Sequence, residues 1–225
     1  MKTLRQHINE AFKIGNNLSE WSVYSCKPKT NDELKDIIRD RIKVQGRECD
    51  LNDIDTSLIT DVSNLFAYSN FNGDISKWDV FSVDDMGAMF YGAKFNQDIS
   101  NWDVSNVINM SNMFSNSNFN GDISKWNTSK VTNMFGMFYE SKFNRDISNW
   151  DVSKVKYMSE MFAGSSFNGD ISKWDVSNVE YMESMFTGSK FSRDISKWKI
   201  NDKCDTYAMF YRCPIKEEFK PKLQK

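Results

Sequence analysis

Histidine is almost missing from the 225-residue sequence, because His7 is the only one and it precedes the repeated part described below. A Ser/His/Asp triad or a histidine metal site therefore cannot be built within the repeats. The sequence also lacks a glycine-lysine phosphate loop and a dinucleotide fingerprint. Carboxylate residues recur alike in every repeat, whereas acid–base catalysis needs one distinctive place. We therefore expect a protein that is not an enzyme and that uses no cofactor and no metal.

Long apolar runs are missing as well. No stretch approaches the roughly 20 apolar residues that span a bilayer, so we expect no membrane insertion. The first fifteen residues also lack the apolar run of a secretory signal peptide. We therefore expect a cytoplasmic or virion-associated protein. The net charge of −2 does not predict nucleic acid as a partner.

Cysteine is scarce, and the regular repeats contain none of it. We expect all four cysteines to be reduced thiols: Cys26, Cys49, Cys204 and Cys213.

The dominant feature of the sequence is a 24-residue repeat. Tryptophan recurs at this interval at Trp78, Trp102, Trp126, Trp150, Trp174 and Trp198. Phenylalanine keeps the same step at Phe66, Phe90, Phe114, Phe138, Phe162, Phe186 and Phe210, and again from Phe71 to Phe191. A fixed period of this size is the signature of a solenoid, in which each coil stacks only on its neighbours. The sequence therefore predicts a solenoid of about seven coils.

Two segments are expected within each coil. Ile99, Trp102 and Val104 have the spacing of a leucine-rich-repeat strand, in which Trp102 and Val104 share one face and Asp103 points away. The next apolar residues, at intervals of three, three and one, predict a short helix or 3-10 segment from Val107 to Phe114. We expect the methionines of this segment to fill the core rather than to bind metal.

The two ends differ from the repeats. Residues 1–49 are expected to form a helical extension and cap, residues 50–213 the solenoid, and residues 214–225 a C-terminal tail. The first fifteen residues predict an amphipathic helix whose apolar face includes Leu4, Ile8 and Phe12. It either packs on the first coil or docks the chain on a larger assembly. Residues 18–25 match the repeat as a degenerate strand.

A second helix is expected in the cap. Thr30 and Glu33 have the spacing of a capping box, apolar residues follow at helical intervals from Leu34 to Ile42, and Gly46 lies where the helix would end. The first coil has no neighbour on one side, so this helix is expected to cover it.

Two columns of polar residues precede the tryptophans. The aspartates that begin each repeat, Asp98 among them, predict turns in which the carboxylate accepts hydrogen bonds from nearby backbone amides. A column of calcium sites is the alternative. The asparagines of the Phe-Asn pairs, Asn120 among them, have the same turn interpretation. Phe-Asn-Gly occurs in every second repeat, at 71–73, 119–121 and 167–169, which indicates either charge spacing or a two-repeat duplication.

The pattern D-I-S-x-W-D-V-S-x-V-x-x-M-x-x-M-F-x-x-S-x-F-N, which covers about residues 50–213, resembles the repeats of BspA-type leucine-rich repeat surface proteins and of mycoplasmal lipoprotein-associated proteins. The resemblance implies an α/β, right-handed leucine-rich-repeat-like solenoid, with short parallel β-strands on one face and short helical or 3-10 segments on the other. It also implies protein binding or adhesion at a surface.

The candidate binding surface is the side of the expected strands that points away from tryptophan. Solenoids bind partners on such extended faces, although a solvated sheet with charge pairs is the alternative. Phe81 stands out because it replaces a serine of the other repeats. The predicted contact residues are Lys77, Asp79, Phe81, Asn101, Asp103, Ser105, Lys125, Asn127, Asn149, Asp151, Lys173 and Asp175.

Two functions follow from these patterns. The first is a non-enzymatic interaction protein that binds a protein or a glycan through its strand face. The second is a structural component of a larger assembly, such as a bacteriophage particle, docked through the first fifteen residues.

Overall fold

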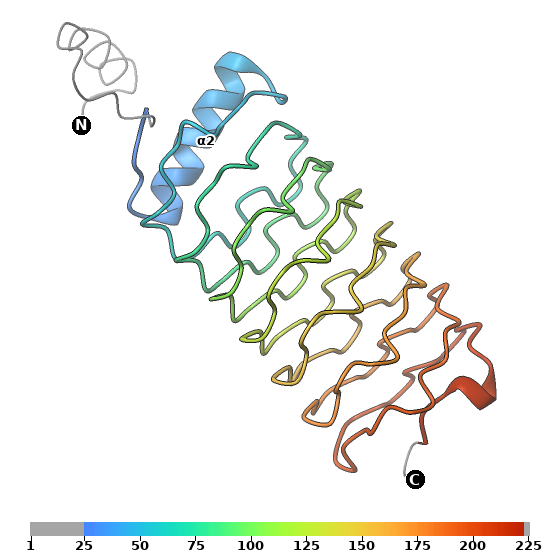
Figure 1. Cartoon of the computed structure of the whole chain (residues 1–225). Helices are drawn as coiled ribbons and strands as arrows, with labels where there is room; N and C mark the ends of the chain where they lie inside the picture. Colours follow the sequence, from blue (N-terminus) through green and yellow to red (C-terminus); the bar gives the residue numbers. More distant parts are fainter. Residues whose placement is uncertain (1–24, 223–225) are drawn as a thin grey trace, which may run out of the picture.

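The computed structural model describes residues 25–222, which form an elongated stack of coils (Figure 1). Successive coils lie side by side along one axis, with the α-helix at one end and the C-terminal segment at the other (Figure 1). The expected helix over residues 1–15, with Leu4, Ile8 and Phe12, lies outside the described residues. So does all of the expected strand over 18–25 except its last residue.

Backbone hydrogen bonds join each coil to the next. In one coil, the amides of Met110, Asn112 and Phe114 donate to carbonyls of the following coil at 2.9, 2.7 and 2.9 Å. The coils also meet in one isolated parallel β-bridge each, and these bridges form a chain along the stack. The bridged residues are Asp61, Asp85, Asn109, Asn133, Tyr157, Tyr181 and Asp205.

Most of the bridges do not lie where the sequence predicted strands; the exception joins Cys26 to Ile54, which occupies the tryptophan position of the first repeat. Instead, the segment around Trp102 consists of turns, in which the Trp102 amide donates to the Ile99 carbonyl at 3.2 Å. The reason is the aspartates of this segment. The Asp98 carboxylate accepts from the Ser100 amide at 2.8 Å, and the Asp103 carboxylate accepts from the Ser105 amide at 3.0 Å. Asx turns of this kind use the amides that a β-ladder would need.

The expected helical segment over 107–114 also differs from the structure. Within residues 25–222, the helices are α2 (Asn31–Gln45) and the 3-10 helix η1 (Glu217–Phe219). In each complete coil, two residues four apart have positive φ, as Asn112 and Asn116 do with φ of 55°. A left-handed residue cannot continue a right-handed helix, so consecutive β-turns replace it.

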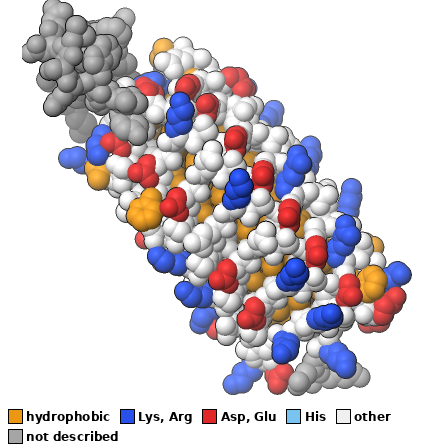
Figure 2. All heavy atoms as spheres, viewed as in Figure 1, with side chains coloured by type: hydrophobic (Ala, Val, Ile, Leu, Met, Phe, Trp, Pro, Cys, Tyr) orange, Lys and Arg blue, Asp and Glu red, His pale blue; other side chains and the backbone are white. Residues whose placement is uncertain are grey.

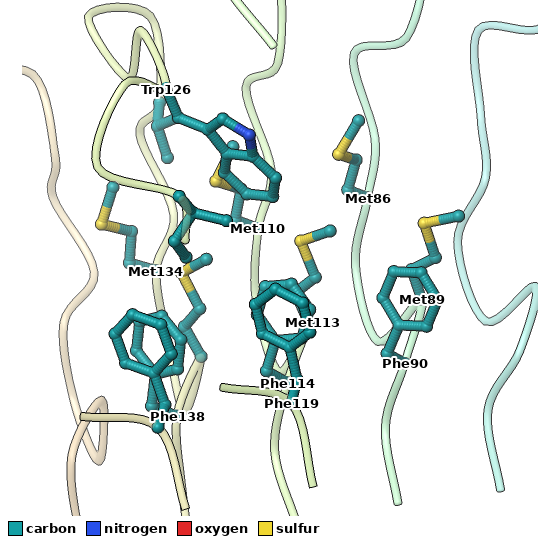
Figure 3. Packing of buried hydrophobic residues seen from close by; sticks show 14 of the residues in the cluster. Met86, Met89, Phe90, Met110, Met113, Phe114, Phe119, Trp126, Met134 and Phe138 are labelled. Atoms are coloured by element: carbon teal, nitrogen blue, oxygen red, sulfur yellow. The ribbon is translucent and has the colours of Figure 1, made fainter. Parts of the chain in front are cut away.

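The apolar side chains form columns that run through the whole stack, as the sequence predicted. Phe114 is fully buried and stacks between Phe90 and Phe138, with ring centroids 5.6 and 5.8 Å away. The methionines fill the space beside these rings, so their prediction as core residues is confirmed (Figure 3). The Trp126 indole N–H donates to the Ile99 carbonyl of the preceding coil at 3.2 Å. Each coil is therefore completed by its neighbour.

The polar columns have the predicted turn roles. The aspartates that begin the repeats accept hydrogen bonds from the amide two residues ahead at 2.8–2.9 Å. The asparagines form a ladder along the stack, in which Asn96 accepts from the Asn120 amide at 2.8 Å and Asn120 accepts from the Asn144 amide at 2.9 Å. These bonds satisfy amides in the part of the coil that lacks bridges.

In the structure, the two-repeat rhythm coincides with hydrogen bonds between coils. The Arg145 side chain donates through Nε to the carbonyl of Asn120 in the preceding coil at 2.9 Å, and Arg193 does the same to Asn168. The acceptor residues are each followed by a glycine, at Gly121 and Gly169. A Cβ atom at Gly121 would lie 2.8 Å from the Phe119 ring, so a side chain there would crowd the core.

Among the described glycines, Gly73 leaves the least room for a side chain. A Cβ atom there would lie 2.0 Å from the Cys49 carbonyl oxygen, and backbone cannot move aside as a flexible side chain can. We expect Gly73→Ala to lower the free energy of unfolding by about 1–3 kcal/mol or more, measured by urea denaturation. The control is Gly188→Asn, because no atom lies within 4 Å there and the matching coil carries Asn116. An effect no larger than that of the control would contradict the clash.

Both ends of the stack are covered. Helix α2 begins as predicted, with the Thr30 hydroxyl accepting from the Glu33 amide at 3.2 Å, and ends at Gly46 with φ of 90°. Leu34 and Ile38 of this helix are buried. At the other end, Ile215 is buried and the Phe219 carbonyl accepts from the Ile195 amide at 3.0 Å. The core is thus shielded where neighbouring coils are missing.

Candidate interaction surface

The predicted contact residues lie at the turns on either side of each tryptophan. All are exposed or partly exposed, and Phe81 is 54% exposed. The aspartates among them also stabilise these turns. Hydrogen bonds from the Ser105 hydroxyl and amide lower the pKa of Asp103, and serines at the same position do so for Asp151 and Asp175. Within residues 25–222, none of the predicted contact residues forms an ion pair.

A different surface, which we call the ladder face, follows the chain of β-bridges. It consists of two columns of side chains, which flank a third column of one buried residue per coil. The buried residues are Val62, Met86, Met110, Met134, Met158 and Met182. One column contains the bridged residues Asp61, Asp85, Asn109, Asn133, Tyr157, Tyr181 and Asp205. The other contains the residues two positions later, namely Ser63, Gly87, Ser111, Phe135, Ser159, Glu183 and Tyr207.

The ladder face changes character along the stack. In its first three coils both columns hold only small or polar residues, whereas later coils bring together Phe135, Tyr157 and Tyr181, which we call the aromatic cluster. These side chains are 37%, 42% and 41% exposed. The Tyr157 and Tyr181 rings stack with centroids 5.3 Å apart and an angle of 8°. Charged residues of both signs are interspersed over the surface seen in Figure 2.

The aromatic cluster borders a groove of about 370 Å³, which Ser159 and Glu183 also line. The Ser159 hydroxyl donates to the Glu183 carboxylate. A neighbouring groove of about 450 Å³ contains Lys156 and Glu180, whose charged atoms pair at 3.0 Å. The hydrogen bond and charge of Glu180 raise the pKa of Lys156, which therefore stays charged. Apolar rings and charges of both signs thus lie on adjacent parts of one surface.

This surface differs from the one predicted from the sequence, because the strands were expected one segment too early. A usable signal was present in the repeats. At the bridged column, aspartate and asparagine give way to Tyr157 and Tyr181 in consecutive repeats, while the core residues beside them do not change. Such a change marks side chains that the stack itself does not require.

Within residues 25–222, no three or more His, Cys, Asp and Glu residues are grouped to hold a metal ion. The four cysteines are free thiols, as expected. Burial raises the pKa of the Cys204 thiol to about 11, and also raises the pKa values of Cys26 and Cys49. Over the same residues, none of the helices has the length and apolar character of a membrane span.

Comparison with known proteins gives one match. The family described as Mycoplasma protein of unknown function, DUF285, matches residues 33–142 and again residues 114–224. The match confirms the similarity to mycoplasmal repeat proteins. No curated protein and no solved structure matches the chain.

Proposed function

Since this chain belongs to the DUF285 family of Mycoplasma proteins of unknown function, we propose from its surface that it is a non-enzymatic interaction protein whose ladder face binds another protein. The observation that carries the proposal is the aromatic cluster. Its rings are exposed at positions where other coils carry Asp, Asn or Ser, so folding does not require them. Exposed tyrosines are typical anchors of protein interfaces. The resemblance to BspA-type repeat surface proteins supports the same class of function.

The arrangement of the rings favours a protein over a glycan. Sugars stack on free faces of aromatic rings, and the stacking of Tyr157 on Tyr181 leaves each ring only one of its two faces for such a contact. Both tyrosines remain partly exposed, and tyrosine hydroxyls form hydrogen bonds at protein interfaces. The ion pair of Lys156 and Glu180 lies beside them. A protein partner fits this mixture of apolar and charged groups best.

Affinity capture with matched variants tests the proposal. We expect the double variant Tyr157→Asn and Tyr181→Asp to lose at least about tenfold in partner recovery, because truncated anchors cost 2 kcal/mol or more at interfaces. The bait is the full chain, the source a lysate of the organism that encodes it, and recovered proteins are identified by mass spectrometry. Asn133 and Asp205 occupy the same column, so both substitutions are compatible with the stack.

The control variant is Asp85→Asn, which changes the polar part of the ladder face to the residue found at Asn109. It should recover the same proteins as the unchanged chain. Recovery of the same proteins by the double tyrosine variant would remove the aromatic cluster from consideration. A second bait with Phe81→Ser and Asp103→Lys tests the turn surface predicted from the sequence.

A further inference from the structure

The groove beside the aromatic cluster contains one carboxylate, that of Glu183. At the matching position other coils carry Ser63, Gly87 or Ser111, so the stack does not require a charge there. Ser159 is 8% exposed, and its hydroxyl donates to this carboxylate and fixes its place in the groove. Within residues 25–222, no Lys or Arg pairs with Glu183, whereas Glu180 of the same coil is paired with Lys156.

Aromatic side chains line the same groove as this carboxylate. Tyr157 uses one ring face to stack on Tyr181, and its other face is turned toward the coil that contains Asn133 and Phe135. These residues line the same groove as Glu183. The face of an aromatic ring carries partial negative charge and attracts a cation within about 6 Å of its centroid. The ring face of Tyr157 and the carboxylate of Glu183 therefore both attract a positive charge in the same groove.

We propose that this groove takes a cationic side chain of the protein partner, an arginine or a lysine, whose charge pairs with Glu183 while its stem packs against Phe135 and Tyr157. The inference rests on the proposed function and names the chemistry that the partner must present. Arginine fits best, because its planar guanidinium stacks on an aromatic ring and donates to a carboxylate at the same time. Lys156 does not compete for Glu183, since it is paired in the neighbouring groove.

Small-molecule titration of the full chain tests this chemistry without the partner. The probes are N-acetylarginine amide and its citrulline counterpart, which has the same shape but no charge. We expect the arginine probe to shift the ring resonances of Tyr157 and Tyr181 in ¹³C-tyrosine-labelled protein, and to bind at least about fivefold more tightly than the citrulline probe. Glu183→Gln should remove this preference. Glu180→Gln, which changes the neighbouring carboxylate, should leave it intact.

The outcomes separate the inference from the proposed function. Equal binding of the two probes, or an arginine preference that survives Glu183→Gln, would overturn the cationic groove. In that case the loss of partner recovery in the Tyr157→Asn and Tyr181→Asp variant would still support the ladder face as the binding surface. Conversely, an arginine preference in a protein whose tyrosine variant recovers every partner would keep the groove and contradict the proposed function.

Discussion

Replacing Phe114 with alanine is expected to lower the free energy of unfolding by about 3–5 kcal/mol, the range for large-to-small substitutions in a close-packed core. Phe114 is fully buried and touches rings of three coils. The Phe119 ring lies closest, with centroids 4.2 Å apart. Because the stack is rigid along its axis, the coils cannot close the cavity without breaking the hydrogen bonds between them. Urea denaturation followed by tryptophan fluorescence measures the loss.

The cost of Phe114→Ala should be compared with the costs of two other phenylalanine substitutions. Phe135→Ser places in the ladder face the residue that the coils before and after it carry, so it should cost less than about 1 kcal/mol. Phe210→Ala removes a ring from the last coil, where Phe186 is the stacked neighbour and Phe210 itself is partly exposed. Its cost should fall between the other two. Equal costs for Phe114→Ala and Phe210→Ala would mean that stacking on both sides does not determine stability.

Much of the core could be predicted from the sequence because the repeat itself contains the information. A residue type that returns every 24 positions must meet its copies if the coils stack in register, and Phe114 does lie between Phe90 and Phe138. Helix α2 was equally predictable. Thr30 and Gly46 are local signals that need no tertiary context, and both have the expected roles, whereas the Glu33 carboxylate accepts from the Lys29 amide just before the N-cap.

The bridges and the turns with left-handed residues could not be predicted in the same way. The left-handed positions are occupied by Ala88 in one coil and Glu160 in another, neither of which signals positive φ. At Ala88 the stack imposes this conformation, because its amide donates to the Ser111 carbonyl of the next coil at 2.7 Å. Spacing of apolar residues alone allows a helix there. The candidate site was missed for the same reason, since its columns are defined by the bridges.

Acid is expected to destabilise this protein strongly, through many small contributions of the same sign. Seven aspartates in the turns have pKa values lowered by hydrogen bonds from serine amides and hydroxyls: Asp74, Asp103, Asp122, Asp151, Asp170, Asp175 and Asp194. An unfolded aspartate has a pKa of about 3.9. A group whose folded pKa lies below this value stabilises the fold at higher pH. That stability is lost as the pH falls through the folded pKa.

We therefore expect the Tm to be constant above about pH 5 and to fall by on the order of 10 °C between pH 5 and pH 2. Scanning calorimetry at several pH values measures it. Asparagine can replace aspartate in these turns. Asn127 occupies the aspartate position of one coil and accepts from the Ser129 amide at 3.1 Å. The triple variant Asp103→Asn, Asp151→Asn and Asp175→Asn keeps the acceptors but removes three of the titrating groups. It should lose less Tm in acid than the unchanged chain, whereas an equally steep loss would show that these turns do not carry the pH dependence.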